Sequence, residues 1–142
     1  MNYAIVLRLL SYILLTEGAL LLLPAVASLC YGEWFVMGVF LFTAALSALA
    51  GAMFHRVKAK SQIFYMREGF VTTALCWLLI SVVGAVPFVL TGCIPNPVDA
   101  LFETVSGFTT TGASILPAVA DLPKGILFWR SFTHWVGGMG VL

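Results

Sequence analysis

The sequence predicts an all-α membrane protein, in which two N-terminal transmembrane helices precede one helix–loop–helix unit whose loop dips into the membrane. Composition is the first observation behind this fold class. Hydrophobic residues make up 61% of the chain and charged residues only 9%, whereas a soluble domain carries about a quarter charged residues. The second observation is a series of apolar segments long enough to cross a bilayer, and the third is an apolar connection between the last two of them. The net charge of +1 does not indicate a nucleic-acid partner. The apolar composition instead predicts that membrane lipid surrounds the chain.

About 20 apolar residues cross a bilayer as a helix, and three segments meet that length. They are Tyr3–Leu29, Trp34–Phe54 and Gly69–Leu90. A fourth segment begins near Lys124 and is still running at Leu142. The first segment is much longer than the apolar core of a secretory signal, about 7–15 residues, so we expect it to be a retained helix.

The basic residues predict the orientation of these helices. The connection at 55–68 holds four Lys or Arg residues, whereas 30–33 and 91–123 hold none. By the positive-inside rule the basic connection is cytoplasmic, and so is the N-terminus. The chain then divides into an N-terminal helix pair at 1–54, a cytoplasmic basic linker at 55–68 and an incomplete helix–pore loop–helix unit at 69–142.

The connection at 91–123 lies on the outer side and carries the signals of a short helix. Asn96 suits an N-cap, Pro97 the first helical position and Asp99 the first turn. We therefore expect a helix at Pro97–Ser106, which at about 1.5 Å per residue covers only about half of the hydrocarbon thickness. The chain must then return through extended backbone. Such backbone is stable at membrane depth only where it lines a water-filled cavity or is buried in protein.

The segment after this helix, Thr109–Ala113, has the chemistry of a potassium site. A dehydrated potassium ion needs oxygens that replace its hydration shell, and backbone carbonyls of a Thr/Gly-rich strand can supply them. Gly112 matters because carbonyls face one axis repeatedly only where some residue adopts a conformation that a side chain would penalise. The candidate potassium ligands are the backbone carbonyls of Thr110, Thr111, Gly112 and Ala113, with Thr109 as a further candidate.

Two blocks of residues resemble a known family. The run FETVSGFTTTGAS at 102–114, followed by WRS at 129–131 and HWVGGMG at 134–140, resembles the Trk/Ktr/HKT superfamily of potassium transporters. Within it, the chain is most similar to the N-terminal part of the bacterial TrkH and TrkG proteins. The resemblance implies a potassium-channel-like fold built from four consecutive helix, pore-loop, helix units, behind two extra N-terminal helices.

The resemblance also implies a role for each element and a set of partners. Gly69–Leu90 becomes the outer helix of the first unit, Pro97–Ser106 its pore helix, Thr109–Ala113 its filter strand and Lys124–Leu142 the start of its inner helix. It implies potassium uptake at the bacterial inner membrane, by a system of the symporter class whose coupling ion the sequence leaves open. The implied partners are a second copy of the full-length subunit and a cytosolic nucleotide-binding regulatory subunit similar to TrkA. Potassium is then the transported substrate, and no covalently bound cofactor is expected.

For several charged residues the sequence allows two roles. Asp99, Glu103 and Asp121 are candidates for the pore mouth, where negative charge raises the local cation concentration. Capping explains Asp99 equally well, and Glu103 could instead bond to nearby backbone groups behind the filter. Arg130 and His134, one helical turn apart, could form a gate or anchor the inner helix, and we favour the anchor because a fixed positive charge facing a potassium path would oppose conduction.

Two features leave alternatives open. Glu17 lies near the middle of the first apolar segment, where an ionisable residue is a functional candidate by default, and we favour a buried structural pair or a neutral acid over a place in the ion path. Cys30 and Cys93 would lie on the same side of the membrane, which allows a disulfide.

One copy of the unit supplies only one filter strand, so three functions compete. The first is potassium uptake with this chain giving the first of four strands. The second is a non-conducting truncated membrane fragment, because the last helix is cut short and three units are missing. The third is a homotetrameric cation channel. We do not expect an enzyme, because no nucleophile with a base, no metal-ligand set and no phosphate-binding loop is found in the sequence.

Overall fold

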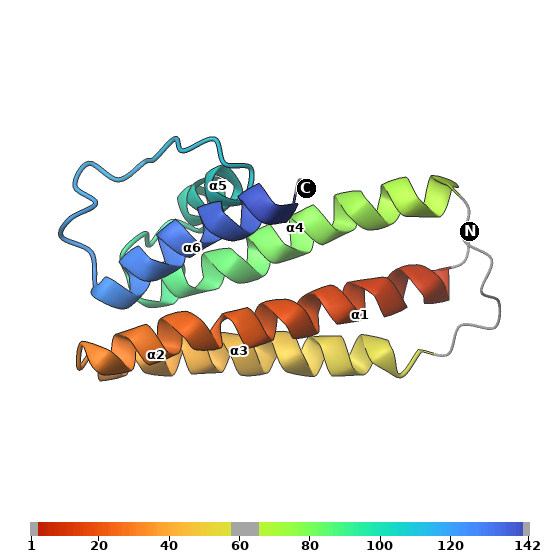
Figure 1. Ribbon diagram of the computed structural model, residues 1–142, viewed down its shortest axis with the longest axis horizontal. Coiled ribbons are helices and arrows are strands. Elements are labelled where there is room, and N and C mark those ends of the chain that lie inside the picture. The colour runs from red at the N-terminus through yellow and green to blue at the C-terminus, as the bar shows by residue number, and fades with distance from the viewer. Residues whose placement is uncertain (1–2, 58–65, 141–142) are drawn as a thin grey trace.

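The structure, a computed structural model, describes residues 3–57 and 66–140. Within these ranges all regular secondary structure is helical (Figure 1). The helices are α1 (Tyr3–Leu20), α2 (Leu22–Cys30), α3 (Trp34–His55), α4 (Met66–Leu90), α5 (Pro97–Phe108) and α6 (Lys124–Gly140). The expected all-α architecture is confirmed for this part of the chain.

The first predicted helix is interrupted at Leu21, and Pro24 explains why. A proline inside a helix has no N–H to donate, and its ring crowds the carbonyl four residues earlier, which here belongs to Leu20. The two pieces stay nearly continuous, since the Leu21 N–H still donates to the Glu17 carbonyl at 2.9 Å. Together α1 and α2 form a candidate membrane span of 28 residues.

Two further helices are long and apolar enough to cross a membrane, α3 and α4. These spans agree with the three segments that the sequence predicts. Helix α6 has 17 residues within the described part of the chain and is not among the candidate spans. The predicted linker at 55–68 is shorter as a connection, because α3 ends at His55 and α4 begins at Met66; its residues 58–65 lie outside the described part.

Helices α1 and α3 pack closely because small residues lie between them. A Cβ added to Gly51 would lie 3.0 Å from the Ser11 carbonyl oxygen, so a larger residue would force the two helices apart by a few tenths of an ångström. The Ser47 hydroxyl donates to the Leu14 carbonyl at 2.7 Å, which adds a polar contact between the same two helices. Small residues of this kind let membrane helices approach without a hydrophobic driving force.

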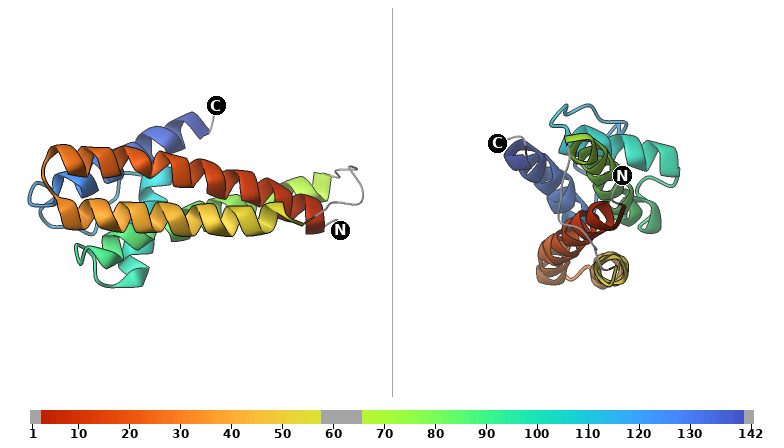
Figure 2. Two further views of the ribbon diagram at one scale, coloured as in Figure 1. Left: turned by 90° about the horizontal axis from the view of Figure 1, so that it is seen from below. Right: turned by 90° about the vertical axis from the view of Figure 1, so that its right-hand side faces the viewer.

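The part of the chain formed by α4–α6 lies against this N-terminal pair. Figures 1 and 2 show α4 and α6 alongside α1–α3, with α5 on the side of α4 and α6 that faces away from the pair. The buried core joins the two parts, since Phe40 of α3 contacts Trp129 of α6 edge to face, with ring centroids 6.2 Å apart. The Trp129 indole N–H also donates to the Gly84 carbonyl of α4 at 3.0 Å. Helix α6 is therefore held by contacts to both α3 and α4.

Candidate functional site

Helix α5 begins as the sequence predicts. The Asn96 side chain accepts a hydrogen bond from the Val98 N–H at 3.0 Å, and Pro97 takes the first helical position. The helix has 12 residues and ends at Phe108, two residues beyond the expected Ser106. It remains too short to cross a bilayer, since 12 residues rise about 18 Å against about 30 Å of hydrocarbon.

The backbone after α5 takes left-handed conformations at two places. Thr110 has φ +57° and Gly112 has φ +76°. The value at Gly112 is readily adopted by a residue without a Cβ, whereas for a β-branched threonine it is an outlier. The surrounding contacts must therefore hold Thr110 in place.

Three successive N–H groups point back at the end of α5. Thr110 donates to the Gly107 carbonyl at 2.9 Å, and Thr111 and Gly112 both donate to the Ser106 carbonyl, at 3.0 and 3.4 Å. No peptide bond among the described residues is cis. In a trans peptide the N–H and the preceding C=O point in opposite directions. The carbonyls of Thr109, Thr110 and Thr111 therefore all point away from α5.

These carbonyls belong to a segment that is open on one side. All residues from 109 to 115 are exposed, while Ser106 and Phe108 at the end of α5 are buried. The Ala113 carbonyl differs from the other three, because it accepts a hydrogen bond from the Ser106 hydroxyl at 2.6 Å and so points back toward the helix. Ser106 thus holds the segment through both its carbonyl and its hydroxyl.

Sequence reasoning did not single out Ser106. A usable signal was present, since a serine in the last turn of an amphipathic helix can bond to the irregular backbone that follows it.

Glu103 lies behind this segment, inside the protein. Its side chain is 1% exposed, and its carboxylate accepts hydrogen bonds from the Ser114 hydroxyl at 3.0 and 3.1 Å and from the Ile115 N–H at 3.1 Å. It also forms an ion pair with Arg130 of α6 at 2.6 Å. Of the two roles considered for Glu103, these contacts match bonding to nearby backbone groups.

The remaining predicted site residues lie around this centre. Asp99 is half-buried in the first turn of α5, and Asp121 is exposed in the loop before α6. The His134 Nδ1 lies 2.9 Å from the Arg130 carbonyl oxygen, and the histidine is half-buried. The sequence-based roles of these residues as mouth, anchor or gate stay predictions.

Two glycines bring α6 against the end of α5. A Cβ added to Gly137 would overlap the Phe108 carbonyl oxygen, and one added to Gly107 would overlap the Thr133 hydroxyl. The helices therefore touch backbone to backbone at the base of the exposed segment. A side chain at either position would push α6 away from it.

The N-terminal part of the chain holds the other end of α6. The Glu33 carboxylate accepts hydrogen bonds from the backbone N–H groups of Lys124 at 2.7 Å and Gly125 at 2.9 Å. A negative charge at a helix N-terminus satisfies unpaired N–H groups and interacts favourably with the helix dipole. Glu33 comes from the turn between α2 and α3, so a residue about ninety positions earlier caps α6.

The remaining candidates from the sequence are clusters of metal-ligating side chains, the cysteines and Glu17. Among the described residues no group of three or more His, Cys, Asp or Glu side chains could hold a metal ion. The three cysteines are free, so the disulfide between Cys30 and Cys93 is not formed. Both carboxyl oxygens of Glu17 are buried without a hydrogen-bond partner in the described part of the chain, which does not match the structural pair that the sequence suggested.

Comparison with known proteins gives consistent matches. The family model described as TrkH, cation transport protein, matches residues 36–142. An uncharacterized cation transporter of Methanocaldococcus jannaschii is 36% identical over 96% of this chain and 28% of its own length. The Trk system potassium uptake protein TrkH of Halomonas elongata is 34% identical over all of this chain and 30% of its own length. TrkG of Escherichia coli, also named a Trk system potassium uptake protein, is 33% identical over 84% of this chain and 25% of its own length.

The chain therefore spans less than a third of the length of these relatives. The family model covers well over half of the chain, and the family consists of transporters, not enzymes. Taken with the three candidate membrane spans, the match shows that the chain belongs to the TrkH family of multi-pass membrane cation transport proteins.

Proposed function

We propose that this chain contributes the first of four strands that line a potassium-selective, channel-like pore in the cell membrane. The observation that carries the proposal is the run of three carbonyls, from Thr109 to Thr111, that point away from α5 on an exposed segment. Carbonyls of this kind, contributed by several strands around one axis, replace the hydration shell of a potassium ion. Relatives named potassium uptake proteins support the choice of ion.

Each neighbouring group then has a part in the filter. The carbonyls of Thr109, Thr110 and Thr111 face the ion, and Gly112 supplies the left-handed turn that continues the strand. The last carbonyls of α5 carry partial negative charge, which favours a cation below the filter. Ser106 and the Glu103–Arg130 ion pair hold the strand from behind.

The rest of the proposal concerns the whole transporter. The relatives are more than three times as long as the part they share with this chain, and we propose that the other three strands come from further units of the same polypeptide. The N-terminus is cytoplasmic and the protein lies in the inner membrane, as a homodimer with a TrkA-like nucleotide-binding subunit on the cytoplasmic side. Asp99 and Asp121 face the outer mouth, and uptake belongs to the symporter class.

The test is Gly112→Ser in the complete transporter. A serine Cβ is penalised at φ +76°, so the carbonyls next to it should turn out of line. We expect the permeability ratio of potassium over sodium, measured as reversal potentials in proteoliposomes, to fall by about tenfold, a change of only ~1.4 kcal/mol.

Gly92→Ser is the matched control. Gly92 also has a left-handed φ, +74°, and also has nothing within 4 Å of an added Cβ, but it lies in the turn after α4. The control carries the same backbone penalty outside the filter and should leave the permeability ratio unchanged. Equal ratios for wild type, Gly112→Ser and Gly92→Ser would remove this segment from the ion path.

A further inference from the structure

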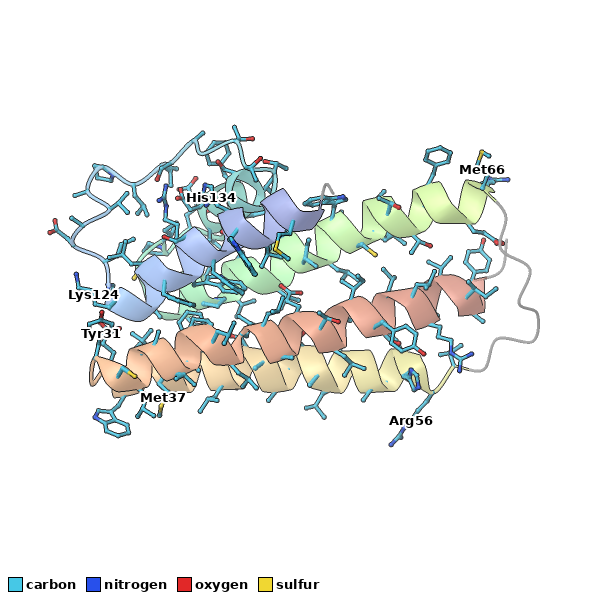
Figure 3. All side chains as sticks on the ribbon, viewed as in Figure 1. Tyr31, Met37, Arg56, Met66, Lys124 and His134 are labelled. Carbon is cyan, nitrogen blue, oxygen red and sulfur yellow. The ribbon has the colours of Figure 1, made fainter. Side chains whose placement is uncertain are left out.

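A wide hollow opens at the end of the molecule where α3 and α6 begin. It has a volume of about 730 Å³, and its lining includes Trp34 and Phe35 from the start of α3 and Asp121, Pro123 and Lys124 from the loop before α6. Figure 3 shows Lys124 and Tyr31 at the same end of the molecule. Because the turn before Trp34 joins two candidate membrane spans, we place the hollow at the level of the lipid headgroups.

A second hollow continues from the first along α3. Its volume is about 510 Å³, it shares Trp34 and Phe35 with the first hollow, and its other lining residues are Gly38, Val39, Phe42 and Leu90. Trp34, Gly38 and Phe42 are spaced four apart and so lie on one face of the helix, over about 12 Å of its length. Nothing lies within 4 Å of a Cβ added to Gly38. The second hollow is thus an apolar groove that runs from the headgroup level into the membrane.

Two charged groups at the mouth of the wide hollow, one acidic and one basic, are available to bind a ligand. The Glu33 carboxylate is occupied by the first N–H groups of α6. The Asp121 carboxylate and the Lys124 ammonium are both exposed and form no ion pair with another described residue. The Trp34 side chain is 67% exposed, and its ring offers a face to a cation. The mouth therefore presents one negative group, one positive group and one aromatic ring.

We propose that the two hollows form a single binding site for a zwitterionic phospholipid with a primary-ammonium headgroup. The phosphate binds the Lys124 ammonium, and the headgroup ammonium donates to the Asp121 carboxylate over the Trp34 ring. One acyl chain lies in the groove against the backbone at Gly38. Tryptophan is enriched at the membrane surface, at the level of the lipid headgroups. The proposal depends only on the membrane location of the chain, so its test is independent of the proposed potassium transport.

The test measures which lipids stay bound to the purified protein by native mass spectrometry. The protein is incubated with an equimolar mixture of phosphatidylethanolamine, phosphatidylcholine and phosphatidylglycerol with identical acyl chains. We expect phosphatidylethanolamine to be retained about five-fold over phosphatidylglycerol, as one partly exposed ion pair predicts. Phosphatidylcholine should lie between them, because its quaternary ammonium has no N–H to donate.

Three variants locate the site. Asp121→Asn should remove the preference for phosphatidylethanolamine, and Lys124→Gln should lower the retention of all three lipids while leaving the backbone cap of α6 intact. Gly38→Leu should fill the groove and lower the retention of all three regardless of headgroup. Ala74→Leu, which adds the same side chain at an exposed position of α4, is the control and should retain lipid as the wild type does.

Two results would overturn the proposal. One is that the wild type retains the three lipids equally, which would mean that the headgroup is not recognised, or retains none of them, which would mean that another part of the longer protein covers the hollows. The other is unchanged retention by Gly38→Leu. Because Gly38 has open space around it, that variant should fold, and its unfolding curve checks this independently.

Discussion

The N-terminal helix pair and the α5–α6 unit each bury one glutamate, and the two are held in opposite ways. Glu17 on α1 is 5% exposed and its carboxyl oxygens have no hydrogen-bond partner among the described residues. Glu103 on α5 is 3% exposed and is bound by Ser114, Ile115 and Arg130. The difference teaches that burial alone does not say what an acidic side chain does in the structure. The partners of a buried acid show what it holds in place.

The same contrast holds for the backbone of the two regions. In the N-terminal pair the backbone is helical except at Leu21 and in the turn at 31–33, so most of its backbone polar groups bond within each helix. After α5 the backbone is irregular from Thr109 to the loop before α6, and its N–H groups need partners from elsewhere. Ser106 and Glu103 supply partners for the N–H groups of Thr111, Gly112 and Ile115. In the described part of the chain, two buried polar residues of α5 thus bond to backbone that lies outside regular secondary structure.

The largest expected effect comes from removing Glu103. Glu103→Met keeps the length of the side chain but leaves Arg130 and the Ile115 N–H without their partner. Breaking a buried ion pair on one side is strongly destabilising, and we expect a loss of about 3 kcal/mol in the free energy of unfolding. The measurement is unfolding of the detergent-solubilised protein by SDS, followed by circular dichroism. Glu103→Gln keeps an acceptor and should lose less, and a loss as large for Gln as for Met would contradict a role for the hydrogen bonds.

The second effect comes from the close contact between α5 and α6. A Cβ at Gly137 would overlap the Phe108 carbonyl, so Gly137→Ala should cost about 2 kcal/mol, as overpacking does. Gly140→Ala is the control, because nothing lies within 4 Å of its added Cβ and alanine favours a helix. The control should be neutral or stabilising in the same unfolding assay. Equal curves for both variants would mean that α6 does not touch α5 at Gly137.

Sequence patterns predicted the elements better than their ends. The start of α5 followed from Asn96 and Pro97, because a cap is a local feature of a few neighbouring residues. The end of α5 lay beyond the expected Ser106, because Gly107 and Phe108 pack on α6, a contact that local patterns do not contain. The break at Leu21 was missed, although Pro24 carries its signal in the sequence.

The partners of the candidate site were harder to predict. The sequence located Thr109–Ala113 and left the role of Glu103 open, but the residues that bond to it are far along the chain. Arg130 lies 27 positions from Glu103, and Gly125 lies 92 positions from Glu33. Such pairs are decided by the way the helices pack, and a single sequence without packing information does not predict them.

A smaller effect is expected where the two regions meet. Glu33→Ala removes the cap from α6, and losing an N-cap or a charge at a helix N-terminus costs about 1 kcal/mol. The same SDS unfolding assay measures it. Glu33→Gln keeps an oxygen for one N–H group and should recover part of the loss. No loss in the Ala variant would mean that the N-terminal pair does not hold α6 through this residue.

The smallest effect, and one of opposite sign, is expected at Glu17. Glu17→Met is the same substitution as at Glu103, but here it removes a buried polar group that has no partner among the described residues. An unsatisfied buried group carries its full desolvation cost, and a flexible apolar side chain of similar length fills the same space. We therefore expect the variant to be unchanged or more stable by up to about 1 kcal/mol. A loss as large as that of Glu103→Met would show that Glu17 has a partner in the complete protein. Both regions would then bury a glutamate that is bound by other groups.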